Sequence, residues 1–371
     1  MRIGIDAREI QNGVFTGIGR ALYNFLHYFD RGIHNDCCFV FSTKPLPFHF
    51  SDKIVNVVME EVTTFIWDQV QLPWSVREKN IEIFYSPYYK LPLFGAEKKV
   101  CAVLDVMYLT FPEYERQMGL PLWLYYQVLG REYLKAAAKI LTCSYFSKED
   151  IIRIWDVDPR KIEVIPLSVS DVYRPDESLA VIEAVRARFD LRGRYILYVG
   201  NFKMHKDVMT LCRAFEMLSE KDKELKLVLV APLKDGYAAM HAWLADKGLL
   251  GRVLFTGAIT DEGTLRTLYS AAEVFVMPSL SEGFGLPPVE AMACGTPVVS
   301  SHAASLPEVV GNAGILIAPG QPEVMAQAVG RILEDQTFRQ DLVIRGLKHV
   351  EQYREARIGK RMFDFFKNLA G

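Results

Sequence analysis

The chain of 371 residues is 50% hydrophobic and 24% charged, an ordinary globular composition that is long enough for two domains with separate cores. Its formal net charge of −2 at pH 7 excludes a general electrostatic attraction to nucleic acid. The first residues lack the apolar core of a signal peptide, and no apolar run is long enough to span a membrane, which excludes a membrane-spanning protein.

Apolar, β-branched segments in the first half predict strands that alternate with helices or loops. The strands are expected at 3–6, 37–42, 54–58, 81–86, 100–104, 140–144 and 162–166, and helices at 18–29 and 147–155. Strands that are joined by crossover segments favour a parallel sheet. In such a sheet, functional groups gather at the carboxyl ends of the strands.

The second half repeats this alternation after a stretch of turn-forming residues at 168–176, which predicts a linker. Strands are expected at 195–199, 225–231, 253–256, 274–277, 298–300 and 315–317, with helices at 207–218, 237–246, 261–271, 288–294 and from 322 onward. We therefore predict an α/β protein with domains at 1–170 and 171–355, followed by a last helix at about 356–371.

Two loops at helix starts carry candidate phosphate-binding groups. Gly17 and Gly19 lie at the start of the first long helix, but Leu22 stands where the dinucleotide fingerprint has its third glycine. The loop could contact a phosphate or serve only as a flexible turn. After the strand at 195–199, the segment Gly200–Asp207 includes Lys206, whose ammonium suits a diphosphate. The alternative is a solvated basic loop.

The most informative segment is Ser279–Ser300, which follows a buried strand. Gly283 and Gly285 allow close backbone approach of a ligand, and the helix that follows directs amide donors at an anion. Glu282 and Glu290 flank this helix start, and carboxylates suit the vicinal hydroxyls of a sugar or ribose. The pattern favours a sugar nucleotide. Alternatively, both glutamates merely occupy a helix start, where acidic residues are favoured.

This segment resembles the E-x7-E signature of retaining glycosyltransferases of family four. The resemblance implies the GT-B fold, two doubly wound Rossmann-like domains facing an interdomain cleft, with the last helix packing back on the N-terminal domain. The N-terminal domain would then lie on the acceptor side, and the C-terminal domain would bind the nucleotide sugar. The implied donor-binding residues are Gly17, Gly19, Gly200, Lys206, Phe284, Gly285, Leu286 and Glu290. The implied catalytic residues are Glu282, Asp105 and Lys206.

Two positions depart from the family pattern. Leu104 stands before Asp105, where the family usually has a histidine that contacts the donor sugar, and Phe202 replaces a common arginine. Leucine cannot hydrogen-bond a sugar hydroxyl. Three explanations remain open: another group replaces the contact, the donor sugar has an apolar edge, or activity is impaired.

The resemblance implies retaining transfer of a hexose from a GDP- or UDP-sugar, with mannose from GDP-mannose as first choice, to a saccharide or polyprenyl-linked acceptor. It is strongest to bacterial mannosyltransferases of surface-polysaccharide assembly. A sugar-nucleotide epimerase and a binding relative with impaired catalysis are the alternatives. We expect no cofactor and no metal, because no Asp-x-Asp follows a strand and the histidines are scattered.

The expected location is cytoplasmic, because the six cysteines form no C-x-x-C pair and suit a reducing compartment. Aromatic residues are dense between 108 and 133, with Arg116 and Arg131 among them. They predict either packing aromatics or a surface for an acceptor or for peripheral contact with the inner face of the membrane.

Overall fold

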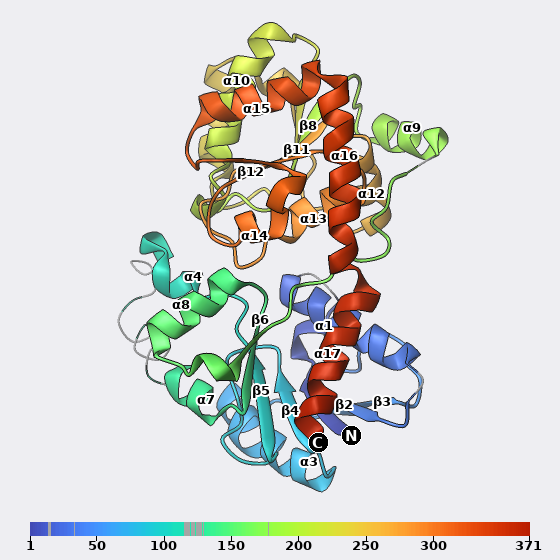
Figure 1. Ribbon diagram of the computed structural model, residues 1–371, viewed down its shortest axis with the longest axis vertical. Helices are drawn as coiled ribbons and strands as arrows, with labels where there is room; N and C mark the ends of the chain where they lie inside the picture. Colours follow the sequence, from blue (N-terminus) through green and yellow to red (C-terminus); the bar gives the residue numbers. More distant parts are fainter. Residues whose placement is uncertain are drawn as a thin grey trace. The chain divides into compact units, whose positions relative to one another are not determined.

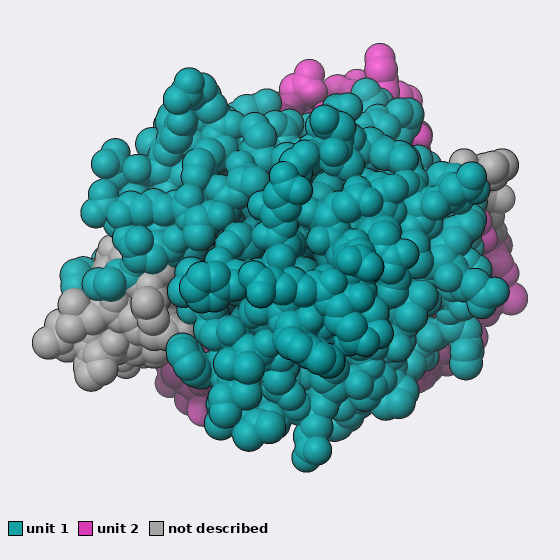
Figure 2. All heavy atoms as spheres, turned by 90° about the horizontal axis from the view of Figure 1, so that it is seen from below, with its two compact units in different colours: residues 1–168, 355–371 teal, residues 169–354 magenta. Residues whose placement is uncertain are grey.

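The computed structural model describes residues 1–13, 16–32, 34–114, 119, 123, 128, 130–176 and 178–371. The chain forms two compact units, coloured separately in Figure 2. The first unit contains Met1–Ser168 and Glu355–Gly371, and the second contains Val169–Arg354. The chain therefore passes from one unit to the other after Ser168 and again after Arg354.

The first unit is built on a parallel sheet of seven strands in the order β3-β2-β1-β4-β5-β6-β7 (Figure 1). The strands are β1 (Arg2–Asp6), β2 (Cys37–Ser42), β3 (Ile54–Val58), β4 (Ile83–Ser86), β5 (Lys98–Ala102), β6 (Lys139–Thr142) and β7 (Ile162–Val164). Each predicted strand is present, and the predicted parallel pairing is confirmed for all neighbours. The order reverses between β1 and β4.

Helices cover both faces of this sheet because its strands are apolar on both sides. The helices are α1 (Gly17–Arg31), α2 (Thr64–Ile66), α3 (Leu72–Glu78), α4 (Met107–Thr110), α7 (Gly130–Ala136), α8 (Tyr145–Trp155) and α17 (Glu355–Ala370). Short turns are η1 (Arg8–Ile10), η2 (Trp67–Gln71, a π-helical turn) and η4 (Pro159–Lys161). One core cluster lies under α1 and α17, and another under α3, α7 and α8.

The last helix, α17, belongs to the first unit although it follows the whole second unit in sequence. It lies beside α1 (Figure 1). Its buried face includes Ile358, Met362 and Phe366, and the Phe366 ring lies 5.4 Å from that of Phe25. This apolar stripe explains why the helix packs on the first sheet rather than ending in solvent.

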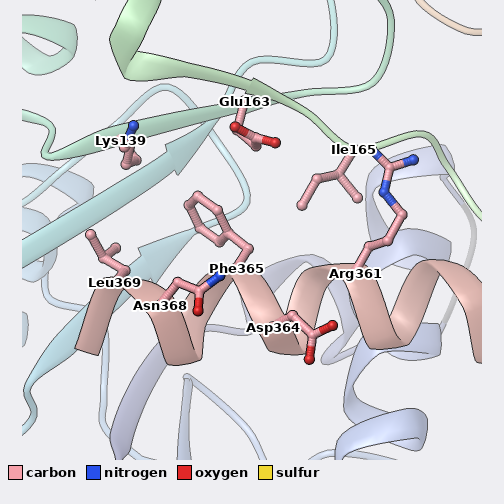
Figure 3. Close-up of a pocket in the computed structure, with 8 residues that line it drawn as sticks. All are labelled: Lys139, Glu163, Ile165, Arg361, Asp364, Phe365, Asn368 and Leu369. Atoms are coloured by element: carbon pink, nitrogen blue, oxygen red, sulfur yellow. The ribbon is translucent and has the colours of Figure 1, made fainter. Parts of the chain in front are cut away.

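A cavity of about 370 Å³ lies between α17 and the edge strand β7 (Figure 3). Its lining residues are Lys139, Glu163, Ile165, Arg361, Asp364, Phe365, Asn368 and Leu369. Arg361 Nη2 donates to the carbonyl of Val164 at 2.9 Å, and Lys139 Nζ donates to that of Arg160 at 2.8 Å. The Arg361 bond therefore holds α17 against the end of the edge strand β7, whereas the Lys139 bond holds the turn η4 against β6.

The second unit has a parallel sheet of six strands in the order β10-β9-β8-β11-β12-β13. Its strands are β8 (Tyr195–Val199), β9 (Lys226–Val230), β10 (Val253–Phe255), β11 (Val274–Met277), β12 (Val298–Ser301) and β13 (Ile315–Ile317). Its helices are α9 (Leu179–Arg188), α10 (Val208–Lys221), α11 (Tyr237–Asp246), α12 (Glu262–Ser270), α13 (Leu286–Ala293), α14 (Leu306–Val310), α15 (Pro322–Glu334) and α16 (Gln336–Val350). Its short turns are η5 (Met204–Lys206), η6 (Leu250–Arg252), η7 (Gly311–Ala313) and η8 (Glu351–Tyr353).

The strands and helices that we predicted in the second half are present within a few residues of their expected limits, and α9 and α14 were not predicted. The residues of α9 show no buried stripe, since none of them is buried. Central strand β11 is fully buried along its whole length, as expected for a sheet covered on both faces. The helix after Gly285 ends before Gly295, whose φ of +77° is readily available only to glycine.

Candidate functional site

The site in the second unit begins where its strand order reverses, between the neighbouring strands β8 and β11. At such a point the loops that leave the two carboxyl ends diverge, and the crevice between them is the usual ligand position in an open α/β sheet. The loop after β8 leads to Lys206, and the loop after β11 contains Glu282. The sheet therefore brings together two predicted residues that are 76 positions apart.

Lys206, Glu282 and Ser279 form a compact polar cluster. Glu282 Oε1 accepts hydrogen bonds from Lys206 Nζ and from Ser279 Oγ, each at 2.6 Å. The side chains of Lys206 and Glu282 are only 12% and 9% exposed. Because an ammonium has three donors, Lys206 retains the capacity to bind a further anion while it holds Glu282.

Backbone contacts hold the two loops in register. The Leu280 N–H donates to the carbonyl of His205 at 2.7 Å, which links the loop after β11 to the turn η5. Ser301 Oγ, at the end of β12, donates to the carbonyl of Ser279. Three neighbouring strands thus contribute to the position of the Lys206–Glu282 pair.

His205 lies beside this pair and is buried, and its burial together with the positive charge of Lys206 lowers its pKa from 6.5 to about 4. Between these values the unfolded chain binds a proton that the folded chain does not, so folding stability is lost as the pH falls from 6.5 toward 4. On acidification from about pH 7.5 to about pH 5, we expect the wild type to lose about 2 kcal/mol more unfolding free energy than His205→Asn. Urea unfolding of both proteins at the two pH values measures this, and parallel losses would contradict it.

Gly285 shapes the loop that leads into α13. Its φ is +90°, and a Cβ at this position would lie 2.7 Å from Leu306 Cδ2, so a side chain would be both strained and crowded. Ser305 Oγ donates to the carbonyls of Glu282 and Phe284, each at 2.9 Å. The loop backbone is therefore held from α14, and the first turn of α13, which starts at Leu286, presents its amide end to the site.

Glu290 lies in α13 and is 3% exposed. Its Oε2 accepts a hydrogen bond from the Tyr269 hydroxyl of α12 at 2.9 Å. Burial and the neighbouring Glu290 charge raise the pKa of Tyr269 well above its ordinary value. The phenol therefore stays protonated and remains a donor to this carboxylate at all physiological pH values.

The end of β8 is packed by aromatic rings. A Cβ on Gly200 would lie 2.5 Å from the Tyr198 hydroxyl oxygen, so this glycine is required by packing whether or not it also contacts a ligand. Phe202 is buried and stacks on Tyr198 and on Tyr237, at centroid distances of 6.5 Å and 6.2 Å. The residue that replaces the family's arginine is thus part of an aromatic cluster.

The remaining predicted residues belong to the first unit. Gly17 begins α1, and the N–H of Gly19 is capped by Thr16 Oγ1 at 3.0 Å. Asp105 follows β5, and its Oδ1 accepts from the Met107 N–H at 3.1 Å. Leu104 packs against the core cluster under α1 and α17. These contacts give local positions and leave the predicted roles of Gly17, Gly19 and Asp105 untested.

Sequence reasoning missed three side chains of the site. Ser279 lies within the motif segment, so its position three residues before Glu282 was a usable signal. Tyr269 and Ser305 lie on other elements, and no local pattern connects them to Glu290 or to the loop backbone. Hydroxyls that hold a buried carboxylate or carbonyl act through tertiary contact, which a linear motif does not record.

The dense aromatic segment is only partly described. Tyr133 is buried, Tyr108 and Trp123 pack against the core cluster under α3, α7 and α8, and Arg116, Tyr125 and Tyr126 lie outside the described residues. Within the described ranges, the helices include none that is long and apolar enough to cross a membrane. Nor do those ranges contain a group of three or more His, Cys, Asp or Glu side chains placed to hold a metal ion.

Comparison with known proteins identifies the family. The family model for glycosyl transferases group 1 matches residues 183–349. The chain is also 33% identical over 283 residues to O-antigen chain mannosyltransferase B of Escherichia coli, covering 76% of this chain and 72% of the relative. The chain belongs to the group 1 glycosyltransferases.

A further relative of this glycosyltransferase, the serotype-specific mannosyltransferase WbdA of Escherichia coli, is 26% identical over 276 residues, which cover 73% of this chain and 34% of WbdA. The chain thus spans about a third of the length of that relative.

Solved structures match the glycosyltransferase over its full length. Sucrose-phosphate synthase from Thermosynechococcus elongatus has a TM-score of 0.74 at 21% identity, with 100% of this chain and 99% of that chain covered. HepE of Anabaena, solved in complex with UDP-glucose, has a TM-score of 0.74 at 16% identity, with 99% of each chain covered. The predicted GT-B fold is thereby confirmed.

Proposed function

We propose that the protein is a retaining hexosyltransferase that moves mannose from GDP-mannose to a saccharide or polyprenyl-linked saccharide of a surface polysaccharide. The observation that carries the proposal is the Lys206–Glu282–Ser279 cluster beside the amide end of α13, with Glu290 buried in the same helix. The mannosyltransferase relatives support the choice of sugar. The HepE complex with UDP-glucose supports a nucleotide sugar as donor class and leaves UDP-sugars as the competing donor.

In this proposal the predicted donor-binding residues of the second unit contact different parts of the nucleotide sugar. Lys206 and the amide end of α13 bind the diphosphate, because both direct positive charge at an anion. Pro287 and Pro288 have no N–H, so the amide donors of this first turn are those of Leu286 and Val289. The backbone of Phe284, Gly285 and Leu286 contacts the sugar and the diphosphate, and Glu290 accepts hydrogen bonds from the ribose. Gly200 keeps the backbone close enough for the donor, and Gly17 and Gly19 face the diphosphate by resemblance.

The proposed reaction breaks the bond between the anomeric carbon and the diphosphate oxygen. The acceptor hydroxyl oxygen forms its bond to the same face of that carbon, and its proton passes to the departing diphosphate. Glu282 orients the sugar and stabilises the positive charge that develops on it, while Lys206 stabilises the negative charge on the leaving group. Asp105 remains a predicted catalytic residue on the resemblance alone. Neutralisation by Lys206 and helix amides is the reason to expect metal independence.

A donor screen tests the proposal directly. We expect GDP-mannose to raise the Tm of the protein more than UDP-glucose or UDP-N-acetylglucosamine, since ligand at about 100 times its Kd adds about 2.7 kcal/mol of stability. The preferred donor is then incubated with polyprenyl-linked saccharides in EDTA, and the anomeric configuration of the product is read by NMR. An inverted product, or a metal requirement, would refute the mechanism. Formation of an epimer without acceptor would favour an epimerase, and binding without turnover would favour an inactive relative.

A further inference from the structure

We propose that Tyr269 is a positioning residue that holds Glu290 in the orientation needed to recognise a ribose diol. It would thereby set the preference of the protein for ribonucleotides over 2′-deoxyribonucleotides. The inference rests on the proposed function of Glu290 and adds a residue on a different helix, α12. The direct observation is the hydrogen bond from the Tyr269 hydroxyl to Glu290 Oε2 at 2.9 Å.

The Tyr269–Glu290 contact is out of reach of bulk water. Tyr269 is 0% exposed and Glu290 is 3% exposed. A buried carboxylate needs hydrogen-bond donors from the protein, because its desolvation is otherwise expensive. Hydrogen bonds to a charged acceptor are also stronger than those between neutral groups. The phenol therefore has a larger effect on the carboxylate than a surface hydroxyl would have.

The Tyr269 ring has no freedom to leave the carboxylate. The rings of Tyr173 and Phe275 lie 6.0 Å and 5.6 Å from it, with interplanar angles of 77° and 58°. Thr296 Oγ1 donates to the Tyr269 carbonyl at 2.6 Å, which also ties the backbone of α12 to the segment after α13. The hydroxyl is thus presented at a fixed point, and the Glu290 oxygen that it binds is fixed with it.

Orientation matters because a ribose has two adjacent hydroxyls. A carboxylate can accept a hydrogen bond from each only when its plane faces the diol, and a nucleotide without the 2′-hydroxyl gains little from that orientation. Loss of the tyrosine hydroxyl should therefore weaken ribonucleotide binding more than deoxyribonucleotide binding. A merely structural role for Tyr269 would reduce stability and leave this ratio unchanged.

The test compares Tyr269→Phe with a matched tyrosine in the same unit. Tyr195 is equally buried, and its hydroxyl donates at 2.7 Å to the carbonyl of Leu268, the residue that precedes Tyr269. Tyr195→Phe therefore removes a tyrosine hydrogen bond to a carbonyl of the same helix, α12, and leaves the hydrogen bond to Glu290 in place. Calorimetry with GDP, UDP and their 2′-deoxy forms gives the Kd values for the wild type and for each variant.

For whichever of GDP and UDP binds more tightly, we expect Tyr269→Phe to raise Kd about tenfold, as loss of a hydrogen bond to a charged group would. The Kd of Tyr269→Phe for the corresponding 2′-deoxynucleotide should differ from the wild-type value by less than about threefold. The preference for the ribonucleotide is then lost in Tyr269→Phe and retained in Tyr195→Phe. Equal behaviour of the two phenylalanine variants would overturn the inference.

Glu290→Ala separates this inference from the function on which it depends. Loss of the carboxylate should raise the ribonucleotide Kd by about five- to a hundredfold. If Glu290→Ala weakens binding and Tyr269→Phe does not, the role of Tyr269 fails alone. If neither variant changes Kd, or if no nucleotide binds to the wild type, the ribose role of Glu290 fails and the inference fails with it.

Discussion

Glu282→Ala is expected to lower kcat about a hundredfold, the range found when one electrostatic group that stabilises a transition state is removed. The physical reason is that, in the proposed mechanism, the carboxylate stabilises positive charge that develops on the sugar only during transfer. The Kd for the nucleoside diphosphate should change much less, because in the proposed site Lys206, the α13 amides and Glu290 hold the diphosphate and the ribose. Steady-state kinetics with the preferred donor and calorimetry with the diphosphate measure the two effects separately.

Glu282→Gln is the closer comparison, because it keeps the shape of the side chain and removes its charge. It should reproduce most of the loss of kcat. Glu220→Ala, which changes an exposed glutamate of α10, serves as the control and should leave both quantities unchanged. A Glu282 variant that lost affinity with kcat intact would refute the proposed charge-stabilising role.

Lys206→Ala is expected to lower the free energy of unfolding by about 3 kcal/mol, since removal of one partner leaves a largely buried charge without its counterion. The remaining carboxylate of Glu282 is 9% exposed and would keep its hydrogen bond from Ser279. Urea unfolding at neutral pH measures the loss. The variant should also bind the nucleoside diphosphate more weakly, because it lacks the proposed diphosphate cation.

A double-mutant cycle isolates the pair. Lys206→Ala combined with Glu282→Ala should be more stable than the sum of the single losses predicts, with a coupling energy of about 1–3 kcal/mol. Lys203→Ala is the matched control, because Lys203 is an exposed lysine on the same loop. A Lys206 variant as stable as this control would show that the pair contributes nothing to folding.

Local sequence patterns predicted most strands because their chemistry is local. The runs Cys37–Ser42, Ile54–Val58 and Tyr195–Val199 were expected at the residues where β2, β3 and β8 lie. Each is a short apolar run flanked by polar or turn-forming residues, and such a run can be read without its neighbours. The helix α9 was missed because it has no buried stripe, and so no amphipathic pattern marks it in the sequence.

Local sequence patterns were sufficient to predict the α/β alternation, the glycine loop before α13 and the two acidic residues that flank it, because backbone preference and helix-start chemistry act over a few residues. The contacts of Lys206 with Glu282 and of Tyr269 with Glu290 could not be predicted in this way, because they depend on how distant elements pack. The first contact depends on β8 and β11 becoming neighbours, and strand order follows from how whole faces are buried rather than from any local motif. The second depends on α12 packing against α13, which brings the buried phenol of Tyr269 within hydrogen-bond distance of the buried carboxylate of Glu290.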